Sequence, residues 1–172
     1  MVQFRDKSGD QAWRVRTAGE IHALCREHGV PLIINDDAQL AADIGAEGVH
    51  LGRDDGSISQ AREVLGDDAI IGVSCYNRIG LAKTAAQNGA DYLAFGSVYQ
   101  SGSKPGAVHC PLPLLGEARS LGLPVVAIGG ITPDNGRAVI EAGADSLAVI
   151  GAVFEAPGIL EAASAFSAIW NQ

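Results

Sequence analysis

The sequence repeats one phrase three times, as Ile44-Gly45-Ala46-Glu47-Gly48-Val49, Asn88-Gly89-Ala90-Asp91-Tyr92-Leu93 and Ala142-Gly143-Ala144-Asp145-Ser146-Leu147. In each copy a helical pattern stops at glycine, and a small residue and an acid then lead into a short apolar run. Glycine is common just after a helix because it adopts the left-handed backbone conformation at little cost. The copies lie about 45–55 residues apart, which predicts a repeated unit of helix followed by strand.

The same alternation continues on both sides of these phrases. Short aliphatic runs, typical of strands covered on both faces, alternate with amphipathic stretches typical of helices. We expect strands at Val2–Arg5, Pro31–Asn35, Gly48–Gly52, Ile70–Ser74, Tyr92–Gly96, Val125–Gly129 and Ser146–Gly151. We expect helices at Ala18–His28, Ala38–Ile44, Ile58–Leu65, Ile79–Asn88, Leu112–Leu121, Asn135–Ala142 and Leu160–Trp170.

Regular alternation of strand and helix predicts an α/β fold with a parallel sheet. The turn after the first strand lacks the GxGxxG pattern of a dinucleotide-binding sheet, so we predict a TIM-type (β/α) barrel that forms a single domain over residues 1–172. A barrel of this type has eight units and we find about seven, so we expect the first β/α unit to be lacking. A late start codon, a genuine truncation, and a gap filled by a partner or swapped segment in a homo-oligomer all remain open explanations.

Composition and charge exclude several classes of function. The 172 residues are 47% hydrophobic and 19% charged, as in an ordinary globular protein. The net charge is −8 and no basic run stands out, so we expect no nucleic-acid partner. Apolar runs fall short of the ~20 residues that cross a bilayer, and the first residues do not resemble a signal peptide, so we expect a cytoplasmic location without membrane contact. Cys25, Cys75 and Cys110 lack disulfide or CxxC spacing, which indicates reduced thiols.

Two pairs of acids follow neighbouring predicted strands, Asp36-Asp37 and Asp54-Asp55. Reactive groups of a (β/α) barrel lie at the carboxyl ends of its strands. Mg2+ is usually held by one or two carboxylates together with substrate phosphates, so acids gathered at one edge of the sheet favour a metal site. Each acid is also a candidate helix cap, and Asp37 before Ala38 fits that role. Both interpretations remain open from the residues alone.

Two further segments at strand ends suit phosphate. Ser101-Gly102-Ser103-Lys104 offers hydroxyls, exposed backbone and an ammonium group, and Arg5 and Lys7 add two cations. Gly129-Gly130 and Ile150-Gly151-Ala152 resemble the phosphate site of the last two barrel strands, where backbone N–H groups beside a helix bind a monoester. The structural alternatives are a solvated polar loop for the first segment and tight turns for the others.

The histidines do not indicate covalent catalysis, because no Ser-His-Asp or Cys-His arrangement is evident from their spacing. We expect His22 and His28 to face solvent on a helix. His50 lies on an apolar strand, and we expect a buried structural group there rather than a general base. His109 lies in a loop with no partner identified.

Six motifs resemble, in order and spacing, those of the thiamine phosphate synthase family. The resemblance runs through essentially the whole chain, apart from that family's first strand and helix. The motifs are Gln3-Phe4-Arg5-Asp6-Lys7, Ile34-Asn35-Asp36-Asp37, Gly48-Val49-His50-Leu51-Gly52-Arg53-Asp54-Asp55, Ile71-Gly72-Val73-Ser74-Cys75-Tyr76, Phe95-Gly96-Ser97-Val98-Tyr99 with Ser101-Gly102-Ser103-Lys104-Pro105, and Ile128-Gly129-Gly130-Ile131-Thr132.

The resemblance implies a transferase that condenses hydroxymethylpyrimidine diphosphate with thiazole phosphate, making thiamine phosphate and pyrophosphate with Mg2+ as cofactor. By position, the implied metal ligands are Asp36 and Asp55. The implied pyrophosphate contacts are Arg5, Lys7, Asn35, Ser101, Ser103 and Lys104. Gln3 and Ser74 are implied near the pyrimidine, and the implied thiazole phosphate contacts are Gly130, Ile150 and Gly151. The implied catalytic residues among these are Arg5, Ser74 and Lys104.

The sequence departs from the family pattern at a few positions. The family usually has threonine at the positions of Ser101 and Ser103, and often has serine at the position of Gly151. Two alternatives stay open. Thiazole tautomerase-like enzymes share the barrel and resemble the chain around Phe95–Lys104, but they have a histidine near Tyr76 and tend to lack the Asn-Asp-Asp motif. The other alternative is a truncated, non-catalytic barrel that binds phosphate ligands.

Overall fold

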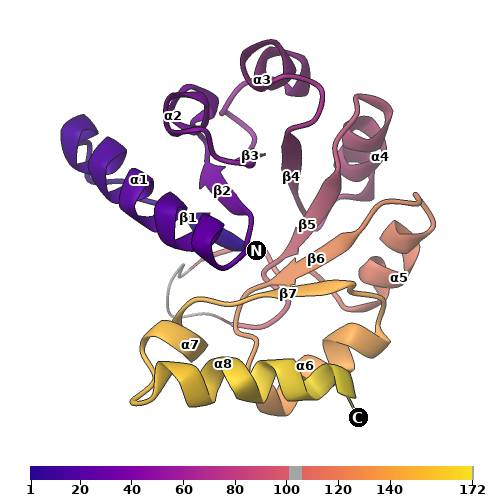
Figure 1. The fold of residues 1–172 in the computed structure, drawn as a ribbon. Helices are drawn as coiled ribbons and strands as arrows, with labels where there is room; N and C mark the ends of the chain where they lie inside the picture. The colour runs from indigo at the N-terminus through magenta and orange to yellow at the C-terminus, as the bar shows by residue number, and fades with distance from the viewer. Residues whose placement is uncertain (101–105, 172) are drawn as a thin grey trace. The chain divides into compact units, whose positions relative to one another are not determined.

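The computed structural model describes residues 1–100 and 106–171. The chain divides into two compact units. Unit 1 comprises Met1–Ser74 together with Asn88–Asp91, and unit 2 comprises Cys75–Gln87 together with Tyr92–Gln172. Each unit is built from parallel strands that alternate with helices (Figure 1). No helix in the described part of the chain has the length and apolar character needed to cross a membrane.

Unit 1 contains parallel strands paired in chain order from β1 to β4. Its helices lie outside these strands (Figure 1). The strands are β1 (Val2–Phe4), β2 (Leu32–Asn35), β3 (Gly48–Leu51) and β4 (Ile70–Tyr76), the last of which belongs to this unit as far as Ser74. The helices are α1 (Gln11–Glu27), α2 (Ala38–Ile44) and α3 (Ile58–Leu65).

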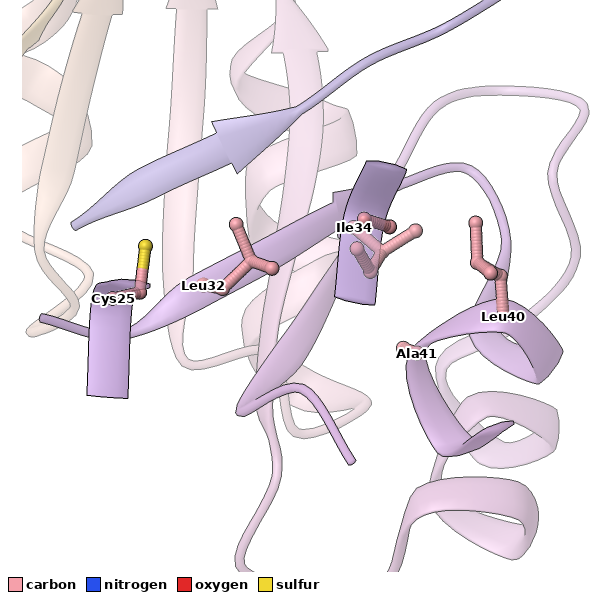
Figure 2. Packing of buried hydrophobic residues seen from close by; sticks show 6 residues of the cluster. Cys25, Leu32, Ile34, Leu40 and Ala41 are labelled. Atoms are coloured by element: carbon pink, nitrogen blue, oxygen red, sulfur yellow. The ribbon is translucent and has the colours of Figure 1, made fainter. Parts of the chain in front are cut away.

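The core of unit 1 lies between β2 and its two flanking helices. Leu32 and Ile34 point from one face of β2 toward Cys25 of α1 and Leu40 of α2, and all four side chains are buried (Figure 2). Successive side chains of a strand point to opposite faces. The residues between and beyond these two, Ile33 and Asn35, therefore lie on the other face of β2.

Helix starts in unit 1 follow from local capping. The Asp37 side chain accepts a hydrogen bond from the backbone N–H of Leu40, which confirms the cap predicted for α2. Ser57 and Gln60 form a reciprocal capping box at the start of α3. α2 ends at Gly45, whose φ of 71° is the left-handed conformation expected where the repeated phrase begins.

The acid of each repeated phrase anchors the start of the preceding strand. Glu47, Asp91 and Asp145 accept hydrogen bonds from the backbone N–H groups of Leu32, Ile71 and Val125, at 2.7, 2.7 and 2.9 Å. Each acid also pairs with a basic group of the helix that leads into that strand. The pairs are His22 with Glu47 at 3.2 Å, Arg62 with Asp91 at 2.7 Å and Arg119 with Asp145 at 3.7 Å. The repeat therefore encodes a strand anchor as well as a helix stop.

Unit 2 contains parallel strands paired in the order β5, β6 and β7. These are β5 (Tyr92–Gly96), β6 (Val125–Ile128) and β7 (Ser146–Ala148). The helices are α4 (Ile79–Gln87), α5 (Pro113–Arg119), α6 (Pro133–Glu141), α7 (Gly151–Phe154) and α8 (Ile159–Ala168), followed by the 3₁₀ turn η1 (Ile169–Asn171). α6 begins with a Thr132–Asn135 capping box and Pro133 in its first turn.

The structure corrects three expectations from the sequence. The strand expected at Ser146–Gly151 ends at Ala148, and Gly151 instead begins the short helix α7, which was not predicted. The helix expected from Ala18 begins at Gln11, because Asp10 caps it through the N–H of Trp13. His22 was expected to face solvent, but its side chain is buried.

His22 is buried because it lies on the inner face of α1. Ala18, His22 and Cys25 are spaced at helical intervals, and all three are buried. The His22 Nδ1 lies 2.9 Å from the carbonyl oxygen of Ile44, and Nε2 lies 3.2 Å from Glu47 Oε1. Both oxygens are hydrogen-bond acceptors, so each ring nitrogen of His22 faces an acceptor. By contrast, His28 and His109 are exposed, and His50 is buried as expected.

Candidate active site

The carboxyl ends of the first strands bring several predicted site residues onto one face of unit 1. Register pairs Gln3 with Ile33, and Asn35 with His50. Neighbours in register share a face, and so do residues two apart on a strand. Gln3 and Asn35 therefore lie on the face of β1 and β2 that is turned away from α1 and α2, and Arg5 follows directly after β1. Ser74, two residues beyond Gly72, which pairs with His50, extends this face on β4.

Asp36 follows β2 in an uncommon backbone conformation. Its φ is 68°, which costs a non-glycine residue roughly 1–2 kcal/mol. Its backbone N–H donates to the carbonyl of His50 at 2.8 Å, and Lys7 donates to its carboxylate. Burial opposes ionisation of Asp36, but hydrogen bonds from Lys7 and Asp55 and the charges of Lys7 and Arg5 outweigh it and lower its pKa. Asp36 is therefore held as a carboxylate beside two cations.

Asp55 is the partner of Asp36 and has the opposite protonation tendency. Burial, together with the hydrogen bond to Asp36 and the charge of Asp36, raises the pKa of Asp55, although the Gly52 N–H opposes this from 2.9 Å. The site therefore places an ionised carboxylate beside a carboxyl group whose pKa is raised. Within residues 1–100 and 106–171, no group of three or more His, Cys, Asp or Glu side chains is arranged to hold a metal. A pair of adjacent carboxyl groups fits Mg2+, which commonly takes its other ligands from phosphate and water.

An open pocket of about 410 Å³ adjoins Asp36 in unit 1. Three predicted residues line it, namely Lys7, Asn35 and Asp36. Arg14 and Asp37 also line it, and they form an ion pair with Nη2 and Oδ2 2.9 Å apart. The pocket therefore combines cations with carboxylates, which is the mixture that binds a diphosphate together with a divalent cation.

His50 supports Ser74 from the neighbouring strand. The His50 Nε2 and the Ser74 Oγ lie 2.8 Å apart. Burial lowers the pKa of His50 to about 4, with the charge of Asp36 opposing the shift. His50 is therefore neutral at neutral pH and acts as a fixed hydrogen-bonding group beside Ser74. This agrees with the structural role expected for it.

In unit 2, the turn after β6 has a shape that requires glycine. Gly129 and Gly130 have φ values of 106° and 62°. A Cβ at Gly129 would collide with the Ser97 side chain, and one at Gly130 would collide with the Gln100 carbonyl. The Gly130 carbonyl accepts a hydrogen bond from Asn135 Nδ2 at 3.0 Å, which ties the turn to the first turn of α6. The backbone of this turn therefore carries no side chains and is held in position by its neighbours.

Ile150 and Gly151 lie where β7 gives way to α7. Ile150 is the N-cap of that helix, and Gly151 is its first residue. The first N–H groups of a helix lack intrahelical partners and are available to an anion. A Cβ at Gly151 would lie 3.0 Å from the Glu155 carboxylate, the mobile end of a flexible side chain, and the φ of Gly151 is not positive. A side chain is therefore sterically tolerated at Gly151.

Three predicted site residues, Ser101, Ser103 and Lys104, lie outside the described residues. The three cysteines are buried and form no disulfide. Burial raises the pKa of Cys75 to about 12 and that of Cys110 to about 11, so neither thiol is primed as a nucleophile.

Comparison with known proteins identifies the family. A family profile described as thiamine monophosphate synthase matches residues 1–153. The chain belongs to this family. It is 54% identical over 166 residues to the thiamine-phosphate synthase of Chromobacterium violaceum, with 96% of this chain and 80% of that protein covered. It is 56% identical over 164 residues to the thiamine-phosphate synthase of Thiobacillus denitrificans, with 95% and 78% covered.

A solved structure of the same family agrees in fold. The thiamine phosphate pyrophosphorylase from Pyrococcus furiosus superposes with a TM-score of 0.90 at 34% identity, covering 98% of this chain and 81% of that one. The predicted fold class, a TIM-type (β/α) fold, and the predicted family are therefore confirmed. The roles assigned to individual residues remain predictions, although all of them lie within the matched residues 1–153.

Arg14 is a charged residue of the pocket that the sequence analysis missed. The predicted helix began at Ala18, so Arg14 was assigned to no element. The signal was Asp10, a residue type favoured at the N-cap, whose side chain accepts a hydrogen bond from the backbone N–H of Trp13 and so starts α1 at Gln11. That start turns Arg14 toward Asp37 on the first full turn of the helix.

Proposed function

We propose that the chain is a transferase that condenses hydroxymethylpyrimidine diphosphate with thiazole phosphate to form thiamine phosphate and pyrophosphate. One observation supports the proposal beyond family membership, namely that the carboxyl groups of Asp36 and Asp55 are adjacent. Lys7 donates a hydrogen bond to Asp36, and the positive charge of Arg5 helps to lower the pKa of Asp36. This arrangement suits a diphosphate leaving group accompanied by a divalent cation. We further propose a cytoplasmic location and small-molecule substrates, and membership of the family supports the substrate class.

The reaction breaks the bond between the pyrimidine methylene carbon and the diphosphate oxygen. The electron pair leaves with pyrophosphate, and the aminopyrimidine ring stabilises the resulting cation until the thiazole nitrogen forms the new carbon–nitrogen bond. Arg5 and Lys7 stabilise the charge that develops on the departing diphosphate. Mg2+, held by Asp36 and Asp55, would supply further charge stabilisation there. No strong protein base is needed, and neutral His50 is consistent with this.

Other predicted residues bind and orient the substrates. Asn35 donates to the diphosphate from the pocket in unit 1, and Ser101, Ser103 and Lys104 are proposed to bind the same group. Gln3 and Ser74 lie on the strand face assigned to the pyrimidine, and His50 fixes the Ser74 hydroxyl. In unit 2, the bare backbone at Gly130 and the start of α7 at Ile150 and Gly151 bind the phosphate of the thiazole.

The activity is tested by incubating the protein with both substrates and Mg2+ and analysing the products. The proposal predicts thiamine phosphate and pyrophosphate in equal amounts. Isomerised thiazole phosphate without pyrophosphate would instead identify a tautomerase, and binding without any product would identify a non-catalytic ligand-binding barrel. Either result would overturn the proposal.

The metal assignment predicts the effect of replacing Asp36. Asp36→Ala should abolish Mg2+-dependent turnover and leave binding of thiazole phosphate largely intact, because that ligand is assigned to unit 2. Asp54→Ala is a matched control that removes an exposed acid beside Asp55. Turnover is measured over a Mg2+ titration, and thiazole phosphate binding is measured by calorimetry. Unchanged activity in Asp36→Ala would remove Asp36 from the metal site.

A further inference from the structure

Arg14 reaches from α1 into the pocket of unit 1. Its Nη2 lies 2.9 Å from Asp37 Oδ2, and its Nη1 lies 3.1 Å from Gln11 Oε1. Only 19% of its side chain is exposed. Its Nε is buried and has no hydrogen-bond partner among the described residues. Arg14 is thus committed mainly to Asp37, and the partly buried pair is screened less by solvent than an exposed ion pair.

Asp37 connects Arg14 to Asp36. One of its carboxylate oxygens caps α2 through the Leu40 N–H at 2.9 Å, and the other accepts from Arg14. The preceding residue, Asp36, has the positive φ of 68° and is held on its other side by the hydrogen bond to His50. A strained backbone persists only where its surroundings fix it from several directions. The Arg14–Asp37 pair is one of these fixed points.

We propose that Arg14 is a positioning residue for the metal site. It holds Asp37, and through Asp37 it holds the backbone of Asp36 in the orientation that brings the Asp36 carboxyl group against Asp55. Arg14 acts in this way without touching the substrate. The inference rests on the proposed function in one respect, because it takes Asp36 and Asp55 to be the groups that hold Mg2+ with a diphosphate.

The alternative is that the ion pair only fastens α1 to the rest of unit 1. The chain offers a control that separates the two roles. Arg62 on α3 pairs with Asp91 at 2.7 Å, and 21% of its side chain is exposed. It belongs to a strand anchor and lines no part of the pocket described above. Arg62→Met therefore removes a comparable ion pair from the same unit.

The test measures binding of Mg2+ with inorganic pyrophosphate by calorimetry, and the Mg2+ concentration for half-maximal turnover. Groups that support a metal ligand typically change metal affinity by 10–100-fold when replaced. Arg14→Met should weaken Mg2+–pyrophosphate binding and raise the half-activating Mg2+ concentration by about tenfold or more. Arg14→Lys should recover part of the loss. Arg62→Met should lower the unfolding temperature but keep both Mg2+ constants within about twofold of the wild type.

A second variant tests the same ion pair in case Arg14→Met does not fold. Asp37→Asn keeps an oxygen to cap α2 but loses the charge that pairs with Arg14, so it should give the same change in Mg2+ constants. Equal Mg2+ constants in the wild type, Arg14→Met and Asp37→Asn would overturn the proposal, and so would an equal change in Arg62→Met. If the wild type binds Mg2+ with pyrophosphate but makes no thiamine phosphate, the proposed function fails while the binding measurement still decides the role of Arg14. Absence of that binding in the wild type would overturn both.

Discussion

Asp36 and Asp55 are the same kind of side chain with opposite tendencies to ionise. Lys7 and Arg5 help to lower the pKa of Asp36, whereas burial and the charge of Asp36 raise the pKa of Asp55. Carboxyl pairs whose environments separate their pKa values are common where chemistry takes place. Here the pKa values of two adjacent carboxyl groups are moved apart, and a bound divalent cation would favour the ionised form of both. At the scale of the residue, Asp36 and Asp55 form a candidate binding site for a divalent cation.

His50 predicts a loss of stability at acid pH. Burial lowers its folded pKa to about 4 from the ordinary histidine value of 6.5. Between these values the unfolded chain binds a proton that the folded chain does not, so the free energy of unfolding falls as pH decreases from about 6.5 to about 4. The loss from this one group should be roughly 3 kcal/mol. Denaturant unfolding at a series of pH values measures it.

His50→Gln keeps a polar group near Ser74 and removes the titration. The variant should therefore lose less stability than the wild type over the same pH range, whatever its stability at neutral pH. Other carboxylates titrate in both proteins, so the difference between the two slopes isolates His50. Parallel slopes for the two proteins would show that His50 is not the group responsible.

At the scale of the element, the three strand anchors explain why one phrase recurs. A buried backbone N–H at the start of a strand needs an acceptor. In each copy a carboxylate from the loop before the next strand supplies it, and a basic group on the connecting helix holds that carboxylate. α1, α3 and α5 provide these groups as His22, Arg62 and Arg119. Strand, helix and following loop are thereby joined at one point.

Glu47→Ala should destabilise the protein by about 1–3 kcal/mol, because it leaves the Leu32 N–H and His22 without their acceptor. Glu63→Ala on α3, which removes an exposed acid, should change the free energy of unfolding by less than about 0.5 kcal/mol. Burial opposes ionisation of Glu47, but the Leu32 N–H and His22 outweigh it and lower its pKa. The stabilisation by Glu47 is therefore present above the ordinary glutamate pKa of 4.5 and is lost as pH falls through the lower pKa of the folded state. Chemical denaturation at pH 7 and at pH 3 measures both effects. An equal loss in the free energy of unfolding for Glu47→Ala and Glu63→Ala at pH 7 would show that Glu47 does not anchor the strand.

Elements with strong local signals were predictable from the sequence. The predicted ranges of α2, α3 and β5 match the structure residue for residue, because capping groups, glycines and apolar runs mark their ends. The start of α1 was missed because its first two turns are mostly exposed and their apolar residues, Trp13 and Val15 among them, form no buried face, so periodicity gave no signal there. β7 was predicted too long because the apolar run Ala148-Val149-Ile150 continues past the last ladder pair into the cap of α7.

At the scale of the whole molecule, a net charge of −8 must coexist with anionic substrates. The cations assigned to the substrate are local: Arg5 and Lys7 both belong to unit 1 and act on Asp36. The carboxyl ends of parallel strands lie at the same edge of a sheet. This topology alone was enough to predict that four residues at or after those ends are neighbours: Lys7, Asn35, Asp36 and Asp55. The contact of Arg14 with the pocket and the burial of His22 depend on which face α1 turns toward the rest of unit 1. The sequence of this helix does not reveal that orientation. The single domain expected over residues 1–172 stays a prediction.

The metal site makes a prediction for the stability of the whole chain. Mg2+ has two carboxyl groups here and needs further oxygen ligands, which pyrophosphate supplies, so the two should bind together much better than either alone. At concentrations about 100 times the dissociation constant, binding adds about 2.7 kcal/mol to the free energy of unfolding. For a chain of this length that raises the unfolding temperature by roughly 5–10 °C. Scanning calorimetry with Mg2+, pyrophosphate, both or neither measures the effect in the wild type and in Asp36→Asn, where the shift should disappear. A shift of the same size in Asp36→Asn, or with pyrophosphate in the absence of Mg2+, would mean that the diphosphate is bound by cations alone and that Asp36 and Asp55 have another role.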